Sequence, residues 1–174
     1  MVRRVRQCVV GDDGFTIIEL LVVCLILGVL AAVAIPSFLN ETAKAYNASA
    51  KELARSAMTT AMTVGTDHQG QYGTISPADL LSYEQTLFTS SASAGYNAWV
   101  ASASGNTDSF VITTEAYSTG VLFSIVDASG TIARYCGNAG TWTPPAVNSS
   151  PNGTGVVAVT VSSYSGGGCN HGAW

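Results

Sequence analysis

The chain begins with a long apolar segment. From Leu20 to Ile35 no side chain is charged or strongly polar, and the apolar residues start at Phe15. As an α-helix, the 25 residues 15–39 would be about 37 Å long. That length is enough to cross the ~30 Å hydrocarbon core of a bilayer, so the pattern predicts a membrane-spanning helix.

A second, amphipathic helical pattern continues directly from the first, over residues 40–64. Its apolar positions recur at spacings of three and four, which places them on one helix face. They are Leu39, Ala43, Tyr46, Ala50, Leu53, Ala57, Ala61 and Val64. We expect Gly65 to end the helix and Pro36 to kink it.

Charged side chains occupy the opposite face of this second half. Glu41 and Lys44, and likewise Glu52 and Arg55, have the spacing of stabilising helical pairs, whereas Lys51 and Arg55 would repel each other.

The rest of the chain, 65–174, reads as a globular head built mainly of strands. Residues 65–95 are loop-like, apart from a short helix that Ser76 would cap. Four β-like runs follow at 96–102, 109–116, 120–128 and 131–136, and 155–163 is a further strand candidate. Because tight turns separate the four runs, we expect an antiparallel meander packed on a helix, which is the α+β class.

Composition and the first residues favour export. Only 10% of the residues are charged, which is low for a soluble enzyme. Arg3, Arg4 and Arg6 precede the apolar segment and should stay cytoplasmic, so the remainder should be exported. A secretory signal peptide cleaved near residues 31–37 is the alternative, although the apolar run is long for one.

Charge argues against a nucleic-acid-binding protein. Without residues 1–14, four basic residues stand against nine acidic ones, a net charge of −5. The sequence therefore predicts no basic patch for nucleic acid, and a minor surface contact with DNA stays open.

The four cysteines fall in different regions. Cys8 lies before the apolar segment and Cys24 lies within it, where a small buried hydrophobe is expected. Cys136 and Cys169 would share an oxidising compartment, so we predict a disulfide between them. In the chain-entropy model, closing the intervening 32 residues would contribute about 3 to 4 kcal/mol.

No catalytic or metal-binding motif emerges. His68 and His171 each lie far from any residues with ligand spacing, and no nucleophile comes with a base motif. We expect no enzyme activity, cofactor or metal. Trp142, Tyr164 and Trp174 are expected to be exposed and could make subunit or surface contacts, although ordinary packing of the disulfide loop is the simpler interpretation.

Residues 14–36, GFTIIELLVVCLILGVLAAVAIP, resemble the N-terminal signature of type IV pilins and of type II secretion pseudopilins. Gly14 matches the residue before the cleaved bond, Phe15 the new N-terminus, and Glu19 the acidic residue that follows. Asp12 and Asp13 depart from many members of the family, which carry basic residues there.

The resemblance implies the type IV pilin fold, with its long N-terminal helix on an antiparallel sheet of about four strands and a disulfide-closed C-terminal loop. It also implies that a prepilin peptidase removes residues 1–14 and methylates the amine of Phe15. Glu19 would meet that amine on a neighbouring subunit. Alternatively, Glu19 would be protonated or reach the membrane surface.

As expected partners, the resemblance implies further copies of the chain, the peptidase and methyltransferase, an assembly platform with ATPase motors, and the membrane before assembly. The assembled pilus would lie on the cell surface and serve adhesion, motility or DNA uptake. A pseudopilin of a secretion or competence system is the alternative, and a monomeric anchored binding protein is a remote one. Gly28 and Pro36 either are simply tolerated in a membrane helix or let the helix loosen on packing.

Overall fold

The computed structural model describes residues 14–90, 97–147, 169, 173 and 174. Its contacts divide the chain into two compact units, Met1–Leu39 and Asn40–Trp174, which are described separately. One helix, α1 (Ile17–Asp67), contributes to both. Residues 1–13 of the expected leader, the 155–163 strand candidate, Tyr164 and His171 lie outside the described residues.

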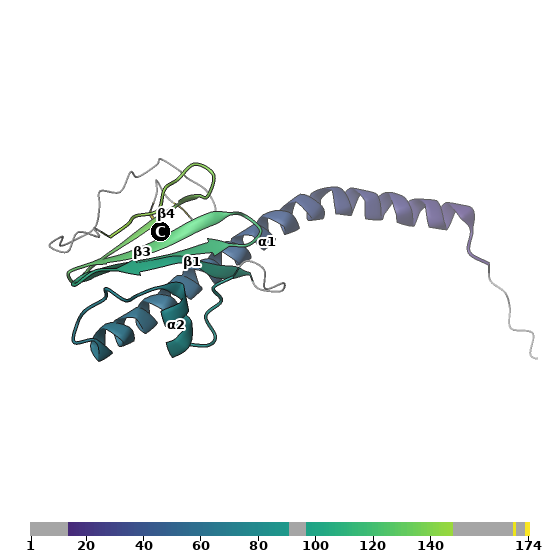
Figure 1. Ribbon diagram of the computed structural model, residues 1–174. Helices are drawn as coiled ribbons and strands as arrows, with labels where there is room; N and C mark the ends of the chain where they lie inside the picture. Colours follow the sequence, from purple (N-terminus) through teal and green to yellow (C-terminus); the bar gives the residue numbers. More distant parts are fainter. Residues whose placement is uncertain (1–13, 91–96, 148–168, 170–172) are drawn as a thin grey trace, which may run out of the picture. The chain divides into compact units, whose positions relative to one another are not determined.

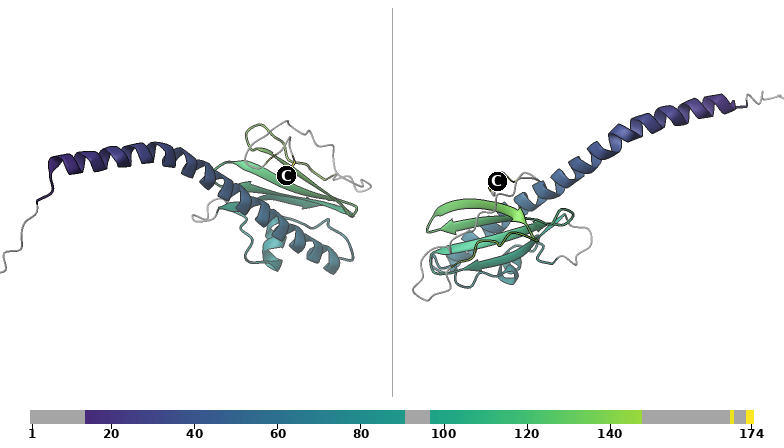
Figure 2. Two further views of the ribbon diagram at one scale, coloured as in Figure 1. Left: turned by 180° about the vertical axis from the view of Figure 1, so that it is seen from behind. Right: turned by 90° about the horizontal axis from the view of Figure 1, so that it is seen from above.

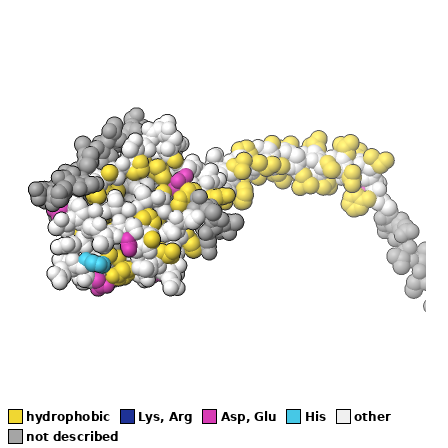
Figure 3. Space-filling view, in the orientation of Figure 1, with side chains coloured by type: hydrophobic (Ala, Val, Ile, Leu, Met, Phe, Trp, Pro, Cys, Tyr) yellow, Lys and Arg dark blue, Asp and Glu magenta, His cyan; other side chains and the backbone are white. Residues whose placement is uncertain are grey.

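In the first unit, α1 is a single helix with its side chains exposed. It begins at Ile17, two residues later than the apolar pattern suggests, and runs through Pro36 without a break. Figure 3 shows hydrophobic side chains along this part of the helix. By length and composition α1 can cross a membrane, and none of the apolar window that qualifies it is buried.

The second unit contains a four-stranded antiparallel sheet, with the strands in the order of the chain (Figure 1). The strands are β1 (Ala98–Gly105), β2 (Ser109–Ala116), β3 (Val121–Ala128) and β4 (Thr131–Asn138). The predicted meander is confirmed, and β2 has the predicted bounds. The pairing of β1 with β2 shifts register once, between Val100 and Ser102.

The second half of α1 packs on one face of this sheet (Figure 2). Ala57, Ala61 and Val64 join a core cluster with Phe110 and Ile112 of β2. The Thr114 hydroxyl donates a hydrogen bond of 2.8 Å to the carbonyl of Ala50. Of the predicted apolar face, Ala50, Ala57, Ala61 and Val64 are buried, whereas Leu39 is 63% exposed. Asn47, Ala54 and Thr60 are buried in addition.

The other face of the sheet is also covered, so Trp142 is not the surface residue that the sequence suggested. Trp142 is only 4% exposed, and a side chain at Gly137 would overlap its indole. Val147 packs with Val111 and Val126 in a separate cluster. Residues 139–147, directly after β4, therefore fold back over the sheet, and both faces of β2 and β3 are buried.

The end of α1 differs from the expected glycine cap. The helix continues to Asp67, and the positive φ angles fall at Gln69 and Gly70 instead. Gly65 is buried, and a Cβ there would overlap the ring of Tyr72. This glycine therefore permits close packing rather than a turn.

The short helix α2 (Pro77–Tyr83) is capped as predicted. The Ser76 hydroxyl accepts a hydrogen bond from the backbone N–H of Asp79, and proline occupies the first turn, where its missing N–H costs nothing. On α1 both predicted ion pairs form, Lys44 with Glu41 at 2.6 Å and Arg55 with Glu52 at 3.3 Å. All four side chains are largely exposed, so each pair contributes little to stability.

Candidate processing and assembly segment

The segment that precedes α1 brings Thr16 and Glu19 together. The Glu19 carboxylate accepts hydrogen bonds from the backbone N–H of Thr16 at 3.0 Å and from its hydroxyl at 2.8 Å. In return, the backbone N–H of Glu19 donates to the Thr16 hydroxyl at 3.3 Å. This reciprocal arrangement is a capping box, in which a threonine and a glutamate three residues later satisfy the free N–H groups of a helix start.

The capping box explains why α1 begins at Ile17 and not at Phe15. It also gives Glu19 a role within the single subunit, which the sequence analysis missed. The sequence contained the signal, because Thr16-Ile17-Ile18-Glu19 has the spacing of a capping box directly before an apolar run. The Glu19 carboxylate therefore has hydrogen-bond donors within its own chain.

The two positions expected at the cleaved bond, Gly14 and Phe15, are exposed ahead of the helix. No heavy atom lies within 4 Å of where a Cβ of Gly14 would be. Phe15 is 78% exposed. An enzyme can therefore approach the bond between them without unfolding any described part of the chain.

The large apolar side chains of the segment are exposed in the described structure. Large hydrophobic residues from Ile17 to Leu39 are each about half exposed or more. Gly28 has open space around it, so nothing in this subunit requires a glycine there. Contiguous apolar surface of this extent marks a surface that a membrane or another protein covers.

Comparison with known protein families finds a known motif in this segment. Residues 11–35 match the family model of the prokaryotic N-terminal methylation motif, a type IV prepilin-like signal. The chain carries a prepilin-type methylation motif. The motif marks a processed precursor of the pilin or pseudopilin type, and it does not mark an enzyme family. No curated protein and no solved structure matches the chain.

The motif and the fold agree with each other. A long apolar N-terminal helix, a four-stranded antiparallel sheet and a disulfide near the C-terminus are consistent with the pilin fold. The apolar helix and the motif together indicate a membrane-anchored precursor.

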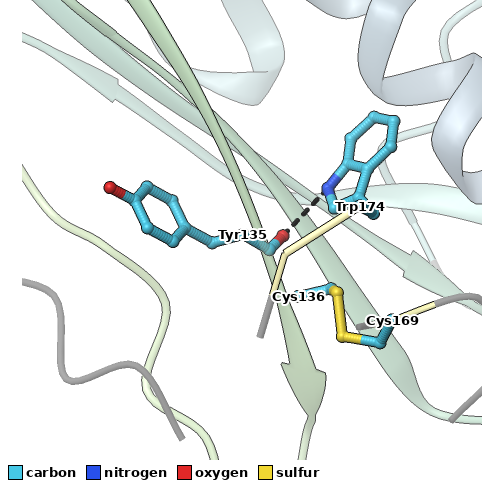
Figure 4. Close-up of a disulfide and its surroundings, with 4 residues drawn as sticks. All are labelled: Tyr135, Cys136, Cys169 and Trp174. Atoms are coloured by element: carbon cyan, nitrogen blue, oxygen red, sulfur yellow. Dashed lines mark hydrogen bonds between the residues drawn. A yellow bond between two sulfur atoms is a disulfide. The ribbon is translucent and has the colours of Figure 1, made fainter. Parts of the chain in front are cut away.

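In the head, the disulfide between Cys136 and Cys169 is present as predicted (Figure 4). Both cysteines are buried in a cluster with Phe123. Trp174 makes a second attachment beside it, because its indole N–H donates a hydrogen bond of 2.9 Å to the backbone carbonyl of Tyr135 (Figure 4). The end of the chain is thus fixed to β4 at two adjacent residues.

The described residues of the head contain no recognisable catalytic or metal arrangement. Among them, no group of three His, Cys, Asp or Glu side chains could hold a metal ion. The nitrogen Nδ1 of His68 lies 2.9 Å from the carbonyl of Val64 in the last turn of α1. A groove of about 440 Å³ lies between α1 and the start of β1, lined by Ser49, Glu52 and Phe88 among others, with no histidine or cysteine in its lining.

Proposed function

We propose that this protein is the structural subunit of a type IV pilus. A prepilin peptidase cleaves between Gly14 and Phe15, the new amine of Phe15 is methylated, and the mature chain polymerises through its N-terminal helix. In this proposal residues 1–14 are the leader, 15–39 the membrane and polymerisation helix, 40–64 its amphipathic continuation and 65–174 the head.

One observation carries the proposal: the methylation motif leads directly into a helix whose apolar side chains are exposed. A lipid bilayer can cover such a helix before assembly. In a filament the helices of neighbouring subunits would replace the lipid. Dispersion contacts between closely packed helices, summed over many side chains, would favour that exchange.

Glu19 has a defined part in this exchange. In the single subunit its carboxylate is held by Thr16 at the start of α1. A carboxylate has lone pairs for more than these two donors, so it can also accept from the positively charged amine of Phe15 on a neighbouring subunit. Such a pair between subunits would fix their axial register.

The partners of the proposal follow from these steps. They are the peptidase and methyltransferase, an assembly platform with ATPase motors that extracts the subunit, and further copies of the chain. The subunit waits in the cytoplasmic membrane with its head outside and ends in an extracellular pilus. Adhesion, motility or DNA uptake would then be a property of the polymer.

The test is the intact mass and N-terminal sequence of the native protein from sheared surface material and from membranes. A chain that begins at N-methylated Phe15 in the sheared fraction is the expected result. The same processed chain confined to membranes would favour a pseudopilin instead. An intact Met1 in cells with an active peptidase would contradict the proposal.

A Gly14→Leu variant sharpens the test, because a branched side chain next to the cleaved bond hinders close approach of the peptidase. We expect unprocessed chain to accumulate in membranes. Gly28→Leu is the matched control, since that position also has open space around it but lies away from the bond. It should be processed normally.

A further inference from the structure

Most of the basic residues of 15–174 lie close together in the second unit. Of the four basic residues in 15–174, three surround the indole of Trp174. From the ring centroid, Lys51 Nζ lies at 5.7 Å, Arg55 Cζ at 5.4 Å and Arg134 Cζ at 5.7 Å. These are distances at which a cation is attracted to an aromatic ring. We call Lys51, Arg55, Arg134 and Trp174 the basic cluster.

The cluster is held rigidly. Lys51 and Arg55 come from α1 and Arg134 from β4, while the indole N–H of Trp174 is bonded to Tyr135. The indole also packs edge-on against Phe123, with 5.8 Å between ring centroids. Burial, and then the charge of Arg55, lower the pKa of Lys51, so bringing these cations together has a cost. The sequence predicted no such basic patch.

The cations remain accessible to a partner. Arg134 is exposed, and the Arg55 side chain, which also pairs with Glu52 at 3.3 Å, is 53% exposed. An aromatic ring flanked by arginines is also the composition of surfaces that contribute strongly to protein contacts. The basic cluster is therefore suited to contact an anionic surface.

The far end of α1 has the opposite character. The helix ends at Asp67 with no basic residue in its last turn, where the helix dipole already places partial negative charge. Tyr83 of α2 lies beside it. A hydrogen bond with Asp67, with the added negative charges of Asp67 and Asp79, raises the pKa of Tyr83. Leu81 and Tyr83 are exposed there, and we call Asp67, Asp79, Leu81 and Tyr83 the acidic end.

Charge decides how two heads can meet. Contact between the basic clusters of two copies would bring like charges together, which is unfavourable. Contact between the basic cluster of one copy and the acidic end of another pairs opposite charges. Such a contact joins two different surfaces, and contacts of this kind build open helical filaments when they do not close into a ring.

We propose that the basic cluster of each head docks on the acidic end of the next head in the filament. This inference rests on the proposed function and names the contact between heads. The occupant is a second copy of this chain, since its own residues 40–174 carry eight of the nine acidic residues of 15–174.

The test compares charge reversals in the full chain expressed in its native host. Arg134→Glu should lower the yield of sheared fibres by about tenfold, because like charges then meet across the contact. Lys44→Glu is the matched control, since it makes the same change of charge at an exposed site outside the cluster. It should leave the yield unchanged.

A second charge reversal tests whether the acidic end is the surface that the basic cluster contacts. Adding Asp67→Lys to Arg134→Glu should restore most of the yield, because opposite charges face each other again. A cation is also favourable at the end of α1, so this variant should fold. Formation of the Cys136–Cys169 disulfide reports folding, and Arg134→Gln replaces any variant that fails this check, with a smaller loss expected.

Each outcome of the fibre-yield experiment either supports or overturns the proposed contact between heads. Loss with Arg134→Glu, recovery in the double variant and a normal Lys44→Glu support the contact. Fibres of Arg134→Glu with normal yield overturn it, and reduced retention of a 30-base-pair DNA duplex on those fibres would assign the cluster to nucleic acid. If the unaltered protein forms no fibres, the proposed function fails instead.

Discussion

The two units of the chain use hydrophobic residues in opposite ways. In the first, Leu20, Leu30 and Phe38 are each more than 60% exposed. In the second, Leu80, Phe110 and Phe123 are fully buried. The head buries its apolar side chains in a core of its own and has a disulfide. The N-terminal helix instead has apolar surface that requires lipid or other helices. In the proposed function, the first unit is the part that assembles and the second is a head with a core of its own.

The largest expected effect comes from removing the carboxylate of Glu19 in the first unit. Glu19→Ala should abolish sheared fibres, because both the capping box and the proposed pair with a neighbouring amine are lost. The head should be untouched, so the subunit should still accumulate with its disulfide formed. Fibre yield measures assembly, and non-reducing electrophoresis measures formation of the disulfide. Normal fibres from Glu19→Ala would refute the pairing.

Thr16→Ala separates the two roles of Glu19. It removes the hydroxyl of the capping box but keeps the carboxylate that would pair with a neighbour. We expect fibres to form at a reduced yield. A complete loss, equal to that of Glu19→Ala, would mean that the cap is the whole role of Glu19.

The next effect is confined to the head. Replacing Cys136 and Cys169 together by serine should lower the free energy of unfolding by about 3 to 4 kcal/mol, because the loop between them is no longer closed. Thermal denaturation followed by circular dichroism measures it. A melting temperature equal to that of the unaltered protein would show that the attachment of Trp174 alone holds the loop.

Two glycine substitutions, one in each unit, test whether the second unit is closely packed and the first is not. Gly65→Ala should lower the free energy of unfolding by about 1 to 3 kcal/mol, because its methyl group would overlap the Tyr72 ring in the core. Gly28→Ala meets no atom, so it should leave unfolding of the head unchanged. Chemical denaturation in detergent compares the two variants. Equal effects would contradict the division into a packed and an unpacked unit.

The smallest expected effect depends on pH. Burial raises the pKa of Glu115. A raised folded-state pKa favours the protonated form, so the contribution to stability is present below about pH 4 and is lost as pH rises through the folded-state value. Glu115→Gln should therefore stabilise the head at pH 7 by only about a few tenths of a kcal/mol, since the group is largely solvated. At pH 3 no difference should remain.

Much of this architecture could be predicted from the sequence, for identifiable reasons. The strands were found because turn residues separate short β-like runs, and the disulfide because Cys136 and Cys169 alone share a compartment. The cap of α2 followed from Ser76 and a proline. Each of these features depends on residues close in sequence or on a simple count.

The features that were missed depend on contacts between distant residues. Trp142 is buried because the segment after β4 folds back on the sheet, and Gly65 is required by Tyr72 rather than by a turn. The basic cluster joins α1, β4 and the last residue, which no spacing rule connects. The capping box is the exception, since Thr16 and Glu19 are three residues apart and could have been recognised.

The most direct test of the central claim uses Cys24. It is exposed in the subunit and is the free thiol among the described residues, while Cys8 would leave with the leader. Labelling with N-ethylmaleimide should modify Cys24 in subunits dispersed and unfolded in denaturant and leave it unmodified in intact, lipid-free sheared fibres. That result means neighbouring helices cover the apolar segment. Equal labelling in fibres and dispersed subunits would contradict assembly through this helix.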